Sequence, residues 1–178
     1  GVAHLAIRHR GTLGGSLAHA DPAADWPALC LACDAIVTVT SMHGSRDVPA
    51  DEFATGMFET ALKSGELISA VRFPRWPARQ RWGLQKMARR RGDFAIVGVA
   101  LTLDFGEAGE ISDARVVLQG VAGRPVLAEA TRAALLGAHP TPALLHEAAR
   151  AARDAAEPGS DVHANADLRR SLMETLTR

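Results

Sequence analysis

The chain has 178 residues, and its twenty Lys and Arg side chains are balanced by twenty Asp and Glu. The lack of a basic excess argues against a nucleic-acid-binding protein. No apolar run approaches the roughly 20 residues that a membrane span needs, and the first residues lack the basic, apolar and cleavage regions of a signal peptide. We therefore expect a cytoplasmic protein with one large or two small domains.

The first part of the chain alternates between predicted helices and strands. Asp51 is a candidate cap for one of the helices, and Pro74 ends the last strand. The predicted elements are a short buried helix over 26–33, a β-branched strand over 35–40, a hairpin with a short return over 42–49, a helix from about residue 52 and a strand over 67–73. This order indicates an α/β unit over residues 1–75.

A proline-containing segment, residues 76–80, is the predicted boundary between two units. The second unit, residues 81–178, consists of strands followed by helices. The predicted strands cover 81–87, 95–105 and 111–120, and the predicted helices cover 126–136, 142–157 and 165–178. Strands that precede helices in this way imply an α+β domain, here with a three-stranded antiparallel sheet.

A glycine-rich stretch near the start is the main candidate for ligand binding. Gly11-Thr12-Leu13-Gly14-Gly15-Ser16 holds three glycines and two hydroxyl side chains in six positions. Consecutive backbone N–H groups in such a turn form a concavity that suits phosphate oxygens, and Thr12 and Ser16 add donors beside them. The alternative is a tight connection between two elements without a ligand. The stretch matches neither of the two common phosphate-loop motifs.

Four blocks of sequence, in order along the chain, resemble one family. They are Arg8 to Asp25 with the glycine-rich stretch, Ser64-Gly65-Glu66-Leu67-Ile68 leading to Val71-Arg72-Phe73-Pro74, Gln85 to Val97, and Ser160 to Ala164 with Leu168-Arg169-Arg170. Together they resemble the FAD-binding medium subunit of the molybdenum hydroxylases, the carbon monoxide dehydrogenase, xanthine dehydrogenase and aldehyde oxidoreductase family. The resemblance begins part-way into the family pattern, which implies that a first flavin lobe with its own Gly-rich loop is missing here.

The resemblance implies a fold and a set of flavin contacts. Residues 1–75 would be the second lobe of a two-lobe FAD-binding domain, and residues 81–178 the small C-terminal domain of the subunit. The residues that would bind the cofactor are Thr12, Leu13, Gly14, Gly15 and Ser16 at the pyrophosphate, and Asp25, Ile68 and Lys86 at the flavin. Lys86 would place a cation near the ring and favour the negative charge of the reduced form.

Each of the three flavin contacts has a plainer interpretation. Asp25 alone would be taken for a cap of the helix that follows it. Ile68 would be an ordinary core residue of a strand, and Lys86 a solvated lysine on a strand. Asp21, directly before Pro22, is typical of a turn.

Other reactive residues do not form a recognisable site. Arg89-Arg90-Arg91 is either a solvated face or a loop near the flavin edge that includes Asp93. Cys30 and Cys33 form a C-x-x-C pair without the further ligands that a closed zinc site needs, so buried reduced thiols are expected and no metal. No residue is required as an acid, base or nucleophile.

The resemblance implies an oxidoreductase subunit that holds FAD. Electrons would pass from molybdopterin through [2Fe–2S] clusters to FAD and then to NAD or another acceptor, and the redox chemistry would belong to the cofactor. The implied partners are an iron–sulfur small subunit and a molybdopterin large subunit, which would determine the substrate. The alternative function is a flavin-free docking domain for these partners.

Overall fold

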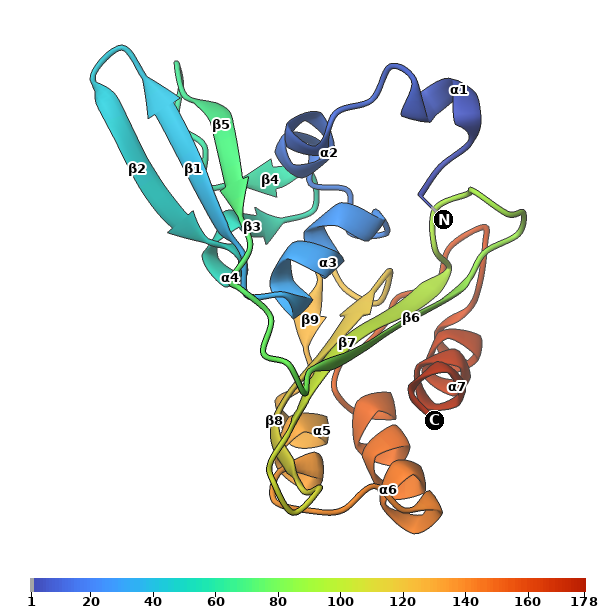
Figure 1. Cartoon of the computed structure of the whole chain (residues 1–178). Helices are drawn as coiled ribbons and strands as arrows, with labels where there is room; N and C mark the ends of the chain where they lie inside the picture. Colours follow the sequence, from blue (N-terminus) through green and yellow to red (C-terminus); the bar gives the residue numbers. More distant parts are fainter. Residues whose placement is uncertain (1) are drawn as a thin grey trace.

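The computed structural model describes residues 2–178, in which two sheet-containing parts are joined by residues 73–80 (Figure 1). We refer to residues 2–72 as the N-terminal part and to residues 81–178 as the C-terminal part. The N-terminal part contains α1 (Leu5–Arg8), α2 (Leu13–His19), α3 (Asp25–Ala32), β1 (Ile36–Ser41), β2 (Gly44–Pro49), α4 (Ala50–Phe53), β3 (Ala54–Gly56), β4 (Glu59–Thr60) and β5 (Leu67–Arg72).

The main sheet of the N-terminal part is antiparallel with the strand order β2-β1-β5, and β3 and β4 form a second pair. Along β1 the side chains alternate, with Val37 and Val39 fully buried. They pack with Leu17 of α2 and Phe53 of α4 in one core cluster. The predicted helix over 26–33 and strand over 35–40 are thus confirmed to within one residue.

The predicted cap at Asp51 is wrong. Helix α4 has Pro49 as its N-cap, and Asp51 lies inside the first turn without capping it. Proline fixes its own φ, here at −57°, and it carries no N–H group. The chain therefore leaves β2 at Pro49 and begins the helical turn one residue before Asp51.

The C-terminal part places an antiparallel sheet against three helices. Its elements are β6 (Arg81–Met87), β7 (Val97–Phe105), β8 (Ile111–Gln119), β9 (Val126–Leu127), α5 (Glu129–Leu135), α6 (Pro142–Arg153) and α7 (Ala166–Thr177). The α+β class is confirmed, but the predicted three-stranded sheet has a fourth strand in the order β6-β7-β8-β9. β9 pairs Val126 and Leu127 with the end of β8. Two residues are too few to show the alternating pattern of a strand, so the helix predicted over 126–136 wrongly included both of them.

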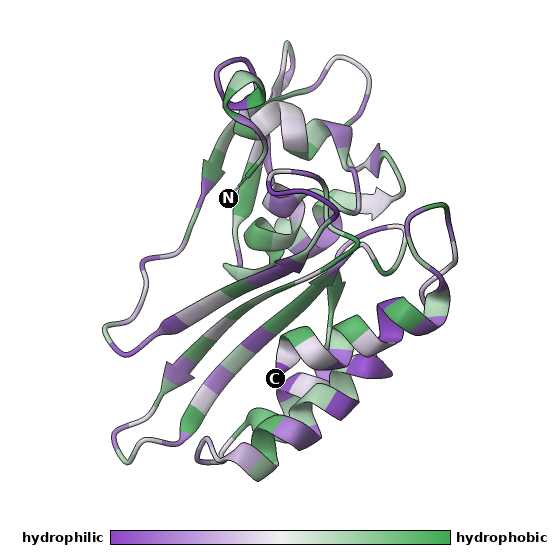
Figure 2. Cartoon of the chain, turned by 90° about the vertical axis from the view of Figure 1, so that its right-hand side faces the viewer, coloured by the Kyte–Doolittle hydropathy of each residue, from purple (hydrophilic) through white to green (hydrophobic). Residues whose placement is uncertain are grey.

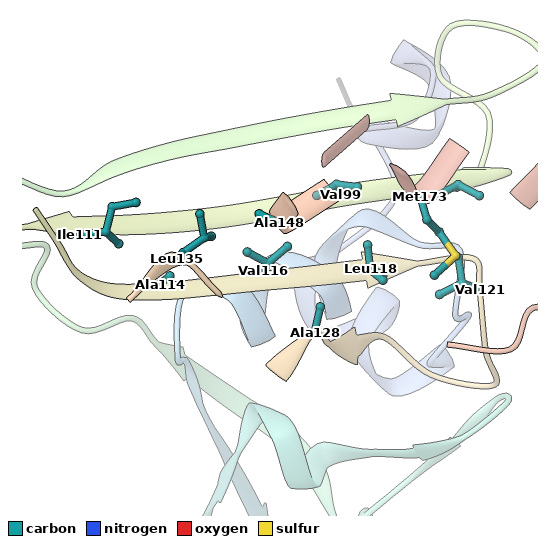
Figure 3. Packing of buried hydrophobic residues seen from close by; sticks show 11 residues of the cluster. Val99, Ile111, Ala114, Val116, Leu118, Val121, Ala128, Leu135, Ala148 and Met173 are labelled. Carbon is teal, nitrogen blue, oxygen red and sulfur yellow. The ribbon is translucent and has the colours of Figure 1, made fainter. Parts of the chain in front are cut away.

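One face of this sheet carries the largest core cluster. Val99 and Val116 point from the sheet toward Leu135 of α5, Ala148 of α6 and Met173 of α7 (Figure 3). In Figure 2 the long helices show hydrophobic and hydrophilic bands, as expected for helices that cover a sheet with one side. Among residues 2–178, no helix is long and apolar enough to cross a bilayer.

The opposite face of the C-terminal sheet binds α3 of the N-terminal part. Ala28, Leu31 and Ala32 pack against Ala100 and Val117. The last carbonyls of α3 also receive donors from the same sheet: Thr102 Oγ1 donates to Ala32 O at 3.0 Å and Arg115 Nε to Leu31 O at 3.1 Å. The Thr102 bond satisfies a carbonyl at the helix end, and the Arg115 bond gives Leu31 O a second donor beside Asp34 N. Helix α3 is therefore shared between the two parts.

Removal of the Met173 side chain tests the C-terminal core. Met173→Ala deletes a fully buried side chain and should lower the free energy of unfolding by about 2–5 kcal/mol. Leu168→Ala on the same helix, where the side chain is 47% exposed, is the matched control and should cost far less. Urea unfolding followed by circular dichroism measures both. Equal losses for the two variants would contradict the packing described above.

Candidate functional site

The glycine-rich stretch, which the sequence predicts as a turn, forms the N-cap and the first turn of helix α2. Thr12 is the N-cap, and its Oγ1 accepts a hydrogen bond from the N–H of Gly15 at 2.9 Å. A Cβ at Gly15 would lie 2.9 Å from the same Oγ1. Glycine at this position thus leaves the capping hydroxyl where it is, whereas a larger residue would shift it slightly.

The same turn keeps hydrogen-bond donors unused. Within residues 2–178, the N–H groups of Leu13 and Gly14 have no acceptor, as is usual for the first residues of a helix. The Thr12 hydroxyl uses a lone pair for Gly15, so its proton remains free to donate. Ser16 lies one residue further along the helix. The turn therefore offers two backbone and two hydroxyl donors to an anion.

Ile68 lies behind this turn. It belongs to β5, and a Cβ built on Gly14 would be 3.7 Å from Ile68 Cβ and Cγ2. The distance corresponds to ordinary van der Waals contact, so α2 and β5 touch at this point. Ile68 also packs at the edge of the N-terminal core. In this structure the residue supports α2 from the side away from the cavity described below.

Asp25 and Lys86 form an ion pair between the two parts. Lys86 Nζ donates to Asp25 Oδ1 at 3.0 Å and to Oδ2 at 2.8 Å, with side-chain exposures of 15% and 5%. Gln119 Nε2 donates to Asp25 Oδ1 at 2.9 Å. We call these three residues the Asp25 cluster. Asp25 does not cap α3, whose N-cap Ala24 makes no side-chain bond, and Lys86 is not a solvated surface lysine.

The register of the C-terminal sheet explains how the cluster forms. Lys86 on β6 pairs with Gly98 on β7, which pairs in turn with Gln119 on β8. A Cβ at Gly98 would be 2.7 Å from Gln119 Cγ and Nε2. The missing side chain in the middle strand leaves the space that the Gln119 side chain occupies. Sequence analysis missed Gln119, although a glycine inside a strand often marks such a close approach.

Residues 20–25 dock on the ends of the C-terminal strands through their backbone. Gly120 N donates to Pro22 O at 2.9 Å and Ala95 N to Ala23 O at 3.3 Å. Asp21 Oδ1 accepts from Ala23 N at 2.8 Å, so the turn role predicted for Asp21 is confirmed. The middle of the segment between α2 and α3 is therefore bound to the ends of two strands of the C-terminal sheet.

Arg169 of α7 binds the backbone at the same strand ends. Its guanidinium donates to the carbonyls of Ile96 and Gly120, the latter at 2.7 Å, and to Asp161 Oδ2 at 2.6 Å. The backbone N–H of His163, that of Ala164 and the Arg169 guanidinium hold the pKa of Asp161 at about 2, although partial burial opposes them. Asp161 and Arg169, both in the fourth sequence block, thus hold the strand ends on which residues 20–25 dock.

A cavity of about 1160 Å³ lies where these segments meet. Thr12, Leu13 and Ser16 of the α2 turn line it, as does Asp25, whereas Gly14, Gly15, Ile68 and Lys86 are not on its surface. Two exposed aromatic side chains, Phe58 (54%) and Phe94 (60%), also face it. Its volume slightly exceeds the range of about 300–1,000 Å³ common for ligand pockets, so the cavity can take a large cofactor.

The arginine run at the end of β6 contributes little to this cavity. Arg89 lines it, while Arg90 and Arg91 are exposed elsewhere. Asp93 Oδ1 lies 3.4 Å from His4 Nε2 of the N-terminal segment. Gly92, with φ of +97°, allows this approach, since a Cβ there would be 2.9 Å from the His4 ring.

Neither cysteine thiol is activated by its surroundings. Burial, with the nearby Cys33 adding to it, raises the pKa of Cys30 to about 12, and burial also raises the pKa of Cys33. Such thiols carry little of the reactive thiolate at neutral pH. Across residues 2–178, no group of three or more His, Cys, Asp or Glu could hold a metal ion.

Comparisons with known proteins agree with this architecture. Residues 1–76 match the family described as FAD binding domain in molybdopterin dehydrogenase, and residues 82–178 match the CO dehydrogenase flavoprotein C-terminal domain. The nicotine 6-hydroxylase medium subunit of Paenarthrobacter nicotinovorans is 36% identical over 177 residues, which cover 99% of this chain and 62% of the relative. The carbon monoxide dehydrogenase medium chain of Hydrogenophaga pseudoflava is 34% identical, with 96% and 59% coverage.

Solved structures give the same result. Carbon monoxide dehydrogenase from Hydrogenophaga pseudoflava superposes with a TM-score of 0.94 at 36% identity, over 99% of this chain and 61% of that one. Quinoline 2-oxidoreductase from Pseudomonas putida 86 gives a TM-score of 0.91 at 39% identity. The chain belongs to the family of FAD-binding medium subunits of molybdenum hydroxylases, and it spans about three-fifths of the length of these relatives.

Loss of one member of the ion pair should destabilise the chain strongly. Lys86→Met leaves the Asp25 carboxylate buried without its counter-charge and should lower the free energy of unfolding by about 3 kcal/mol. Asp25→Leu combined with Lys86→Met removes both charges and should recover most of that loss. Lys63→Met, at the exposed second lysine of the chain, is the control. A loss below about 1 kcal/mol in Lys86→Met would show that the pair does not hold α3.

The lowered pKa of Asp161 predicts a pH dependence. A carboxylate that is more acidic in the folded chain stabilises it above the unfolded pKa near 3.8, and this contribution disappears as the pH falls toward 2. Asp161→Asn should therefore be less stable than the natural chain at pH 7, with a difference that narrows from about pH 4 downward. Urea titrations at several pH values measure this, and Asp167→Asn, at a 93% exposed side chain, is the control. A constant difference from pH 7 to pH 2 would refute it.

Proposed function

We propose that this chain is the second flavin lobe and C-terminal domain of a molybdenum hydroxylase medium subunit and that it binds FAD. The supporting observation is the cavity, because it brings the donor-rich turn of α2 and the Asp25 carboxylate together in a chain of this family. The two units would be residues 1–75 and 81–178, a division supported by the separate matches to residues 1–76 and 82–178.

The residues present fit the pyrophosphate of the cofactor. The free N–H group of Leu13 and the hydroxyls of Thr12 and Ser16, which line the cavity, would donate to phosphate oxygens, while the positive end of the helix adds a favourable charge. Gly15 keeps the cap intact and Gly14 lets α2 lie close to Ile68. These two glycines would therefore act by shaping the turn.

Other residues of the cavity lining suit a flat apolar ring system with polar edges. Phe58 and Phe94 are large apolar side chains of this lining that are left half exposed, and a bound ring would cover them. Asp25 would accept a hydrogen bond from the cofactor. Lys86 would act through Asp25, so the ring would face the field of an ion pair and not that of a bare cation.

The flavin, when bound, supplies reversible electron transfer, and the residues of this chain bind and orient it. We propose that it receives electrons from [2Fe–2S] clusters of a small subunit, which lie between it and the molybdopterin of a large subunit, and passes them to NAD or another acceptor. Relatives named as medium subunits or medium chains support this assembly. On this proposal the chain is part of an oxidoreductase.

Titration with FAD tests the proposal. We expect saturable quenching of flavin fluorescence by the chain, with affinity at least tenfold weaker in Ser16→Glu, because a carboxylate at the α2 turn would repel the pyrophosphate. A glutamate near a helix N-terminus does not destabilise the helix, so the variant should remain folded. Ala18→Glu, on the exposed side of the same helix and away from the cavity, is the matched control.

The same titration is repeated with the chain fused behind the N-terminal portion of the Hydrogenophaga pseudoflava medium chain, since the relatives are longer. Binding by either protein that Ser16→Glu weakens and Ala18→Glu does not would support the proposal. Failure of both to bind FAD would overturn it and leave the alternative of a flavin-free docking domain.

A further inference from the structure

We propose that Gln119 is a positioning residue that holds the Asp25 carboxylate against Lys86 and so controls the electrostatic field at the edge of the cavity. The inference goes beyond the pairing of Asp25 with Lys86, because it assigns a role to an uncharged residue that does not line the cavity. It rests on the proposed function only for its effect on the flavin. The positioning itself concerns residues of this chain.

The position of the Gln119 side chain directs its amide N–H toward Asp25. Its side chain is fully buried, and its Nε2 donates to Asp25 Oδ1 at 2.9 Å. Asp25 Oδ1 thus accepts from both Gln119 and Lys86, whereas among residues 2–178 Oδ2 accepts from Lys86 alone. A carboxylate with a donor on each oxygen cannot rotate without breaking one of these bonds, so the third bond fixes its plane.

The other half of the Gln119 amide supports this assignment. Its Oε1 is buried and has no hydrogen-bond partner among residues 2–178. An unsatisfied buried acceptor costs stability that an apolar side chain of the same shape would not. The unsatisfied Oε1 therefore offsets part of the stability that the bond from Nε2 to Asp25 contributes. The amide supplies an N–H donor directed at Asp25, and a methionine side chain has no such donor.

The sheet is built to admit this side chain. Gly98 lies between Lys86 and Gln119 in register, and any Cβ there would overlap Gln119 Cγ, Cδ and Nε2, at 2.7–2.8 Å. A glycine within a strand also weakens the strand. Two locally unfavourable residues, Gly98 and Gln119, thus occur side by side in register and serve the same hydrogen bond to Asp25.

The reactivity of Lys86 shows how firmly Asp25 holds its ammonium group. Lys63 and Lys86 are the two lysines of the chain, so competitive acylation with an amine-reactive ester, read by peptide mass spectrometry, gives the reactivity of Lys86 relative to exposed Lys63. We expect Gln119→Met to raise this ratio at least threefold, because Asp25 loses its fixed orientation and holds the ammonium less firmly. The free energy of unfolding should change little, because the lost bond to Asp25 is offset by removal of the unsatisfied Oε1.

Two further variants complete the experiment. Gly98→Ala should reproduce the increase, because its Cβ displaces the Gln119 amide, and it keeps the test decisive if Gln119→Met does not fold. Thr131→Val, in α5, removes another fully buried and unpartnered polar atom away from the cluster and should leave the ratio unchanged. An unchanged ratio in Gln119→Met, or an increase that only accompanies a loss of stability, would overturn the positioning role.

The flavin potential is the second readout. With Asp25 less fixed, Lys86 would neutralise the reduced flavin more effectively, and Gln119→Met should shift the reduction equilibrium toward reduced FAD about tenfold, about 30 mV for a two-electron couple. If the natural chain binds no FAD, the proposed function fails while the lysine reactivity still decides the positioning. If FAD binds and the potential does not move, the effect on the flavin is refuted.

Discussion

The buried charge of Asp25 is the constraint on which the arrangement of the two parts depends. A carboxylate that is almost completely removed from water requires a counter-charge and further donors. Its own part of the chain supplies neither, and both come from the C-terminal sheet, as Lys86 and Gln119. The first turn of α3 is thereby bound to one place on that sheet. Because α2 and residues 20–25 precede this turn directly, the position of the α2 donors follows from the same interaction.

The two faces of the C-terminal sheet make different kinds of contact. One face packs against α5, α6 and α7 and forms a conventional apolar core. The other face carries a row of apolar residues under α3, with the polar Asp25 cluster at one end and Thr102 and Arg115 at the other. Helix α3 is therefore fixed by polar contacts at both ends and by apolar contacts along its length. Such a support is rigid enough to hold the hydrogen-bond donors of α2 in place.

Several elements could be predicted from the sequence because their signals are local. The β-branched run at 35–40 is a strand, and the carboxylate before Pro22 forms a turn, as the residues indicated. Other features lack a local signal. The strand β9 is two residues long, and the helical start at Thr12 was hidden by glycines that usually indicate loops. In each case the contacts of the folded chain outweighed the local preference.

The sequence by itself determined the family, the α+β class and the chemical character of the glycine-rich segment, since these depend on residue types in order along the chain. The tertiary structure decided which residues act together. Sixty-one residues separate Asp25 from Lys86, and ninety-four separate it from Gln119. No periodicity in one sequence encodes such a pairing, because it arises only when the strand register places Lys86, Gly98 and Gln119 side by side beneath α3.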